Sequence, residues 1–74
     1  MKSYVLPIVI EKDEDGYFVT CPSLQGCYTQ GDTYEEAIEN IKDAIRLHIE
    51  ARLESKEKIV EPDSISVAAV EVKV

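Results

Sequence analysis

Long apolar runs are missing from this chain of 74 residues. No stretch approaches the roughly 18 consecutive apolar residues that a membrane-spanning helix requires. At the N-terminus one lysine, Lys2, precedes a short apolar run that ends in acids, without the small-residue cleavage site of a secretory signal. We therefore expect neither a membrane protein nor a secreted one, and we predict a cytoplasmic location.

Basic residues are also scarce: eight Lys and Arg stand against fifteen Asp and Glu, which gives a net charge of −7. They form no cluster, and the nearest pair, Lys56 and Lys58, is flanked by acids. Because neutralisation of phosphates dominates nucleic-acid affinity, direct binding to nucleic acid is not expected. The acidic surface is either simply solvated or meets a basic partner by electrostatic steering.

Metal-ligating side chains are few, with two cysteines and one histidine. A structural zinc site needs four ligands, so a metal would require ligands from a second chain. Cys21 and Cys27 are six positions apart, which does not match the C-x-x-C spacing of a thiol redox pair. A cross-strand disulfide is geometrically possible but is disfavoured in a reducing cytoplasm. We predict two partly buried structural thiols beside a turn at 22–26, with no metal and no cofactor.

Catalytic constellations are equally absent from the sequence. His48 falls on the apolar stripe of a predicted helix and has no expected nucleophile beside it, so a histidine at the edge of the core is the favoured interpretation over a general base. The acids in residues 12–16 lie at a turn, where acids are common, and no glycine-rich phosphate loop occurs. The prediction is that the chain is not an enzyme.

Alternating apolar residues predict three strands in the first half of the chain. Residues 3–10 place apolar side chains on both faces, although Pro7 cannot donate to a ladder and usually marks an edge or a bulge. Residues 13–16 form a turn, and residues 16–21 form the second strand of a hairpin. A short third strand follows at 27–30.

A helix is the clearest predicted element. Thr33 and Glu36 form a capping box, in which the hydroxyl accepts from the Glu36 amide and the carboxylate reaches back. Apolar residues then recur at helical spacing, and the helical signals end near residues 54–58, before Pro62. The stripe contains Tyr34, Ala37, Ile38, Ile41, Ala44, Ile45, His48 and Ile49.

The last ten residues, 65–74, are rich in β-branched side chains and predict a final strand. The expected fold is an α+β domain of order β-β-β-α-β, in which a mixed sheet carries one helix on one face. So small a domain is marginally stable, and one sheet face lacks a helix, so we predict a homodimer or a dimer of dimers. Its interface is predicted at Ile65, Val67 and Ala69.

Residues 13–45 resemble the HicB-like antitoxin family, and the likeness extends over about residues 4–62. The family shares a G-Y-F/V strand, a P-x-L-x-G-C turn and a G-D-T sequence followed by E-E-A. Those positions here are Gly16, Tyr17, Phe18, Pro22, Leu24, Gly26, Cys27, Gly31, Asp32, Thr33, Glu35, Glu36 and Ala37. Gln25 departs from the family, in which proline is common at that place.

The resemblance implies a fold similar to a truncated ribonuclease H domain, formed by a single HicB-like domain over residues 1–74. It also implies a role: binding and neutralising a small basic toxin that cleaves messenger RNA. Longer members carry a C-terminal DNA-binding domain that is not expected here. The catalytic likeness does not carry over, because Pro7, Ile8 and Val9 stand where an acid would be needed. A stand-alone oligomeric binding module for another protein remains the alternative.

The outer face of the predicted helix is the candidate partner-binding surface. Acidic residues recur four positions apart along this face, and such like-charged pairs mildly destabilise a helix. Fewer lysines stand between the acids than on an ordinary solvated face. Loops 11–16 and 22–31 and the sheet edge are the alternative surfaces. The candidate residues are Asp32, Glu35, Glu36, Glu39 and Asp43.

Overall fold

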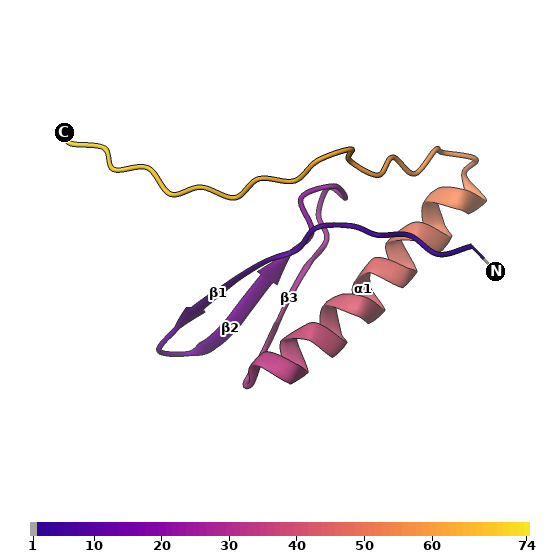
Figure 1. Ribbon diagram of the computed structural model, residues 1–74. Coiled ribbons are helices and arrows are strands. Elements are labelled where there is room, and N and C mark those ends of the chain that lie inside the picture. The colour runs from indigo at the N-terminus through magenta and orange to yellow at the C-terminus, as the bar shows by residue number, and fades with distance from the viewer. Residues whose placement is uncertain (1) are drawn as a thin grey trace.

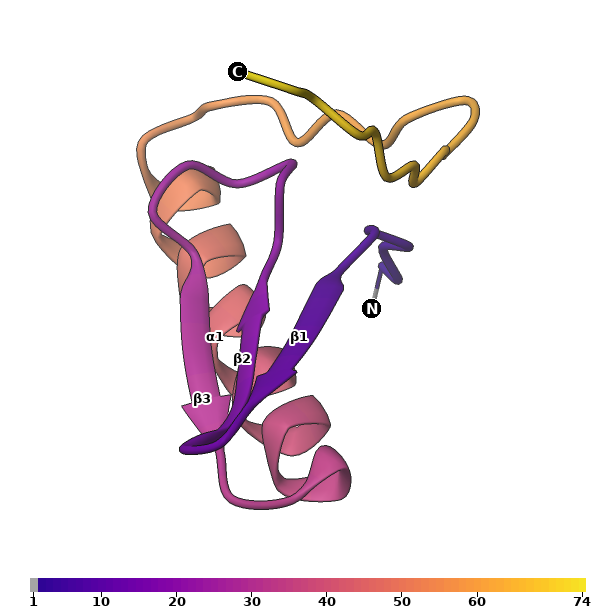
Figure 2. The same ribbon diagram turned by 90° about the vertical axis from the view of Figure 1, so that its left-hand side faces the viewer.

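The computed structural model describes residues 2–74 and consists of a small sheet with one helix packed against it (Figure 1). Its elements are β1 (Val9–Asp13), β2 (Gly16–Thr20), β3 (Tyr28–Gly31) and α1 (Tyr34–Glu54). The strands form an antiparallel sheet in the order β1-β2-β3, and α1 covers one face of it (Figure 2). The predicted α+β class, with one helix on one face of a sheet, is confirmed.

The β1–β2 hairpin has the predicted two-residue turn. Asp13 is paired with Gly16 and Ile10 with Val19. Gly16 has a φ of +131°, a conformation that residues with a side chain rarely adopt. The turn therefore fixes the register that places Val19 on the side of the helix.

The core lies between this face of the sheet and α1. Val19 of β2 and Ala37 and Ile41 of α1 are at most 1% exposed. The buried cluster also includes Ile49 of α1 and, at one end of the sheet, Cys21, Leu24 and Cys27. The predicted alternation of β2 and the predicted apolar stripe of the helix are both confirmed, because the buried residues of these two elements come from the predicted sets.

The predicted start of α1 is also confirmed. Thr33 is the N-cap, and its hydroxyl oxygen accepts a hydrogen bond of 3.0 Å from the amide of Glu36. The Glu36 carboxylate accepts from the amide of Asp32 at 3.3 Å, one residue earlier than the predicted return bond to Thr33. Both bonds satisfy amide groups at the helix start that have no partner within the helix.

The first strand is shorter than predicted. Residues 3–8 precede β1 without forming a ladder, and pairing with β2 begins only at Val9. Pro7 has no amide hydrogen to donate, and β2 ends at Thr20, opposite Val9, so the earlier residues have no strand to pair with.

The predicted final strand at 65–74 does not pair with the sheet. These residues are exposed and carry no regular structure, so the sheet is three-stranded and antiparallel rather than mixed. After α1 the chain crosses one end of the sheet and then continues on the side away from α1 (Figure 1). The segment has the composition of a strand, but it pairs with no strand of its own chain among residues 2–74.

No helix formed by residues 2–74 combines the length and the apolar character that crossing a bilayer demands.

Candidate protein-binding surface

The cysteine-flanked turn at 22–26 closes on itself through backbone hydrogen bonds. The amide of Cys21 donates to the carbonyl of Cys27 at 2.9 Å, and the amides of Leu24 and Cys27 donate to the carbonyls of Cys21 and Leu24, each at 3.1 Å. Arg52 of α1 donates from Nη2 to the carbonyl of Gln25 at 3.3 Å, which ties this turn to the last turn of the helix. The turn is a structural link between sheet and helix.

Both thiols are free and buried in the core. Burial raises the pKa of Cys21 and of Cys27 above the ordinary thiol value, and for Cys27 the nearby Cys21 adds to the rise. The reactive form of cysteine is the thiolate, so these groups are poor nucleophiles at neutral pH. Their environment agrees with the predicted structural role.

Acidic side chains gather at the opposite end of the sheet, where the β1–β2 turn meets the start of α1. On the hairpin side, the Asp13 carboxylate accepts a hydrogen bond of 2.9 Å from the amide of Asp15. This bond is a local turn contact that stabilises the hairpin tip. It leaves both carboxylates at the surface, because Asp13 and Asp15 are exposed.

Gly31 brings the helix start up to this hairpin. It is the last residue of β3 and is paired with Tyr17 of β2. A Cβ at this position would lie 2.6 Å from the backbone nitrogen of Ala37 and 2.9 Å from its Cα. Only a residue without a side chain allows the first turn of α1 to pack so closely on the sheet.

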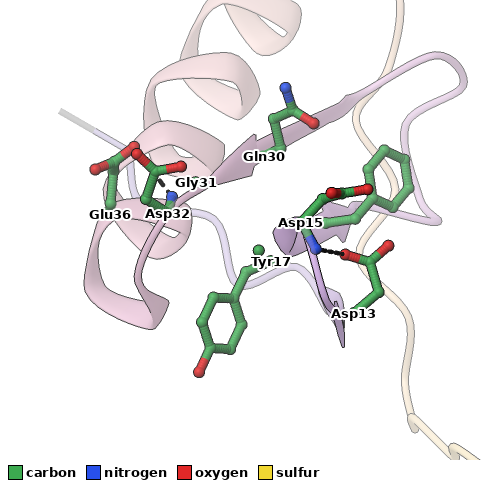
Figure 3. A pocket seen from close by; sticks show the side chains of 9 residues that line it. Asp13, Asp15, Tyr17, Gln30, Gly31, Asp32 and Glu36 are labelled. Atoms are coloured by element: carbon green, nitrogen blue, oxygen red, sulfur yellow. Dashed lines mark hydrogen bonds between the residues drawn. The ribbon is translucent and has the colours of Figure 1, made fainter.

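The two sides enclose an open hollow of about 460 Å³. Figure 3 shows Asp13 and Asp15 on one side and Asp32 and Glu36 on the other, with Tyr17, Gln30 and Gly31 between them. Glu14 and Glu35 are exposed neighbours in sequence, which makes six carboxylates at this end. We call the residues Asp13, Glu14, Asp15, Asp32, Glu35 and Glu36 the acidic end.

The carboxylates of the acidic end form no ion pair among residues 2–74, although the Lys12 ammonium lies 5.8 Å from the centre of the Tyr17 ring, which lines the hollow. Among residues 2–74, the ion pairs are Lys42–Glu39 at 3.5 Å and Arg46–Asp43 at 3.4 Å, both farther along the helix. The N-terminus of α1 favours acids in its first turn, where Glu35 and Glu36 lie. The acidic end therefore carries a concentrated negative potential that suits a basic surface.

The five predicted partner-binding residues fall into two groups. Asp32, Glu35 and Glu36 belong to the acidic end, whereas Glu39 and Asp43 each have a cation one helical turn away. The sequence pattern on the helix alone could not reveal that the hairpin acids Asp13 and Asp15 join the first group, because this depends on how the helix packs on the sheet.

One expectation about the first strand changes with its observed bounds. Because β1 begins at Val9, its central residue is Glu11, so this strand does carry an acid at its middle. Glu11 is exposed, and it is paired with Phe18. Within the described residues, no three His, Cys, Asp or Glu side chains converge closely enough to hold a metal ion.

The sheet face opposite α1 carries an aromatic pair that the sequence interpretation did not single out. Phe18 of β2 and Tyr28 of β3 have ring centroids 5.9 Å apart and are 41% and 61% exposed. Alternation along β2 could have found this pair, since Phe18 lies between two residues that face the helix.

Known proteins resemble the chain over most of its length. The family described as "HicB_like antitoxin of bacterial toxin-antitoxin system" matches residues 6–73. A UPF0150 protein of Archaeoglobus fulgidus is 48% identical over 67 residues, which cover 89% of this chain and 91% of that protein. Antitoxin HicB 1 of Photorhabdus laumondii is 38% identical over 73 residues, which cover 97% of this chain and 47% of that protein.

A solved structure has the same fold. The crystal structure of the N-terminal domain of Burkholderia pseudomallei antitoxin HicB superimposes with a TM-score of 0.70 and 34% sequence identity. The likeness covers 81% of this chain and 72% of that domain.

Proposed function

Because this chain belongs to the HicB-like antitoxin family of bacterial toxin–antitoxin systems, we propose that it binds and neutralises a small basic toxin that cleaves RNA. Membership of an antitoxin family implies a toxin partner. In this proposal the chain acts in the cytoplasm as a stoichiometric inhibitor with no catalytic activity of its own. It does not bind nucleic acid directly, in keeping with its net charge of −7.

The acidic end is the observation that supports a basic partner. A toxin that cleaves RNA needs a basic surface to hold phosphates, and carboxylates can occupy that surface in place of the RNA. Six carboxylates from the hairpin and the helix start, none of them in an ion pair among residues 2–74, provide such a substitute. The hollow between them, about 460 Å³, can receive a lysine or arginine side chain from the partner.

Glu39 and Asp43 extend this surface along α1 but contribute less in the proposal. Each already has a cation within 3.5 Å, so its charge is partly compensated before any partner arrives. Exposed pairs of this kind are individually weak, and they can rearrange when a partner binds.

The first experiment identifies the partner. The tagged chain is recovered from its native host, and the proteins bound to it are identified by mass spectrometry. We expect a basic protein of fewer than about 100 residues, the size of a small domain. Recovery of a different kind of protein at stoichiometric level, with no basic one, would favour the alternative of a stand-alone binding module.

The second experiment locates the surface with two variants of equal charge. Asp13→Asn, Asp15→Asn, Asp32→Asn and Glu36→Gln together change the net charge from −7 to −3 (−7 + 4) and keep groups that can accept the local hydrogen bonds. The control carries four neutral amides elsewhere on the helix. Its substitutions are Glu39→Gln, Asp43→Asn, Glu50→Gln and Glu54→Gln.

The association rate with the partner, measured at low salt, should fall by about tenfold or more in the first variant and much less in the control. The difference should shrink at 1 M salt, where the Debye length is only about 3 Å. Equal losses in both variants would mean that overall charge matters and that the acidic end is not the binding surface.

A further inference from the structure

We propose that residues 68–74 of one copy of this chain add as a fourth strand to the β1 edge of a second copy, and that the exchange is reciprocal. The C-terminal segment and the edge it fits are both unsatisfied in the single chain. This inference does not depend on the identity of the toxin.

The C-terminal segment has the composition of a strand and the exposure of an unpartnered surface. Val67, Val70 and Val72 are 75%, 83% and 74% exposed. Valine favours strands, and a contiguous run of exposed valines on a small protein indicates a surface that another surface covers. Beyond residue 67 the only charged residues are Glu71 and Lys73, so the segment is neutral and can approach an acidic body without repulsion.

The β1 side of the domain offers both a free ladder and an apolar groove. β1 is an outer strand of the sheet, so one row of its backbone groups has no strand beside it. Next to the residues that lead into β1, a groove of about 680 Å³ runs between the N-terminal segment and the helix. The apolar residues that line it include Tyr4, Leu6, Ile8, Ile38, Ile45 and Leu53.

A strand laid along this edge would fill the groove with alternate side chains. Ile10 is paired with Val19, so it shares the helix side of the sheet, and Ile8 lies two residues earlier on the same side. An added strand likewise directs every second side chain towards the helix, and Val70 and Val72 form such a set. The segment 68–74 has seven residues, and β1 has five.

The chain's own tail is directed away from this position. The Glu61 carboxylate accepts a hydrogen bond from the amide of Val5, so the chain crosses the N-terminal segment there. Ile65 and Val67 then line a small hollow with Pro7, Val9 and Pro22. Val9 lies on the side of the sheet opposite Ile10, so the tail has passed the helix side before residue 68, and it continues away from α1 (Figure 1).

A second copy is the occupant that satisfies both features at once. In a twofold exchange each chain donates its C-terminal segment to the partner and receives the partner's segment. The same contacts therefore cover the β1 edge and the groove of both chains. A foreign protein would cover the groove or the tail and leave the other exposed. Of the predicted interface residues, Ala69 lies within the exchanged segment. Ile65 and Val67 precede the segment and contact the chain that donates it.

The acidic end stays accessible in this arrangement, because the tail leaves from the opposite end of the sheet (Figure 1). Assembly and partner binding therefore use different parts of the molecule.

Two valine variants test the exchange by light scattering of the full chain at micromolar concentration. Val70→Glu should reduce the mass from a dimer to the 8.3 kDa of one chain, because the charge would enter the groove. Val60→Glu is the matched control: Val60 is 69% exposed and lies outside the segment, so this variant should stay dimeric. Both variants should remain folded by circular dichroism, since both positions are exposed in the single chain.

A mixture of isotope-labelled and unlabelled protein then shows which segments meet. We expect intermolecular nuclear Overhauser effects between the methyl groups of Val70 or Val72 and those of Leu6, Ile38 or Ile45. A wild-type chain that is monomeric at these concentrations would overturn the proposal. So would a dimer in which these contacts are intramolecular, or one in which the tail stays free.

Discussion

Replacing Gly31 with alanine is the substitution that best probes how the acidic end is assembled. The added Cβ would lie 2.6 Å from the Ala37 nitrogen, 2.9 Å from its Cα and 3.0 Å from the Glu36 carbonyl carbon. All three neighbours are backbone atoms, so no side chain can rotate away. The first turn of α1 must move off β3, or the strand must bend.

Overpacking of this kind typically costs about 1–3 kcal/mol. The upper part of that range is expected here, because the obstacle is the backbone of the longest element in the fold. For a domain of 60–100 residues each kcal/mol lowers the melting temperature by roughly 4–8 °C. Thermal unfolding followed by circular dichroism at one protein concentration should therefore show a loss of about 10 °C or more.

A second substitution separates backbone from side-chain crowding. If the obstacle is the backbone, Ala37→Gly cannot relieve it, and the double variant should be less stable than Gly31→Ala alone. Recovery of stability in the double variant would show that the methyl group of Ala37 was the obstacle. A loss below about 0.5 kcal/mol for Gly31→Ala would refute the close packing itself.

Three further predictions concern the cap and the thiols. Thr33→Ala should lower the free energy of unfolding, measured by chemical denaturation, by about 1 kcal/mol. Thr33→Ser keeps the hydroxyl and should lose much less stability. Equal losses in the two variants would contradict the role of Thr33 as the N-cap. Cys21 and Cys27 should react with a thiol reagent only at the rate of opening of the fold, and immediate reaction of both would show that they are accessible. Unfolded thiols release their protons near the ordinary value of 9.0, before the buried ones do, so stability should fall above that pH. The fall in stability with pH should be steeper in the wild type than in the double variant with Cys21→Ala and Cys27→Ala. Identical dependence of stability on pH in the two proteins would contradict the raised pKa values.

The local signals in the sequence predicted most of the fold. The Thr33–Glu36 capping box, the turn before Gly16 and the apolar stripe of the helix each depend on neighbours within a few residues, and each is present in the structure. The two strand errors have another origin. Residues 3–8 and 65–74 have strand-forming composition, but a strand also requires a partner with free backbone groups, and composition does not specify where that partner is.

The candidate site was less accessible to prediction for a related reason. Helical spacing identified Asp32, Glu35 and Glu36, but it could not show that Asp13 and Asp15 approach them from the hairpin. That meeting depends on the absence of a side chain at Gly31 and on the pairing of Gly31 with Tyr17. Spacing could have indicated the ion pairs of Lys42 with Glu39 and of Arg46 with Asp43, because residues three apart are neighbours on a helix.

Inhibition of RNA cleavage tests the central proposal most directly. The basic protein recovered with this chain is purified alone and incubated with RNA while increasing amounts of the chain are added. We expect cleavage to stop near a fixed stoichiometric ratio, and we expect the variant with four neutralised residues at the acidic end to require more protein at physiological salt. RNA cleavage that continues unchanged with the chain in large excess would contradict the account.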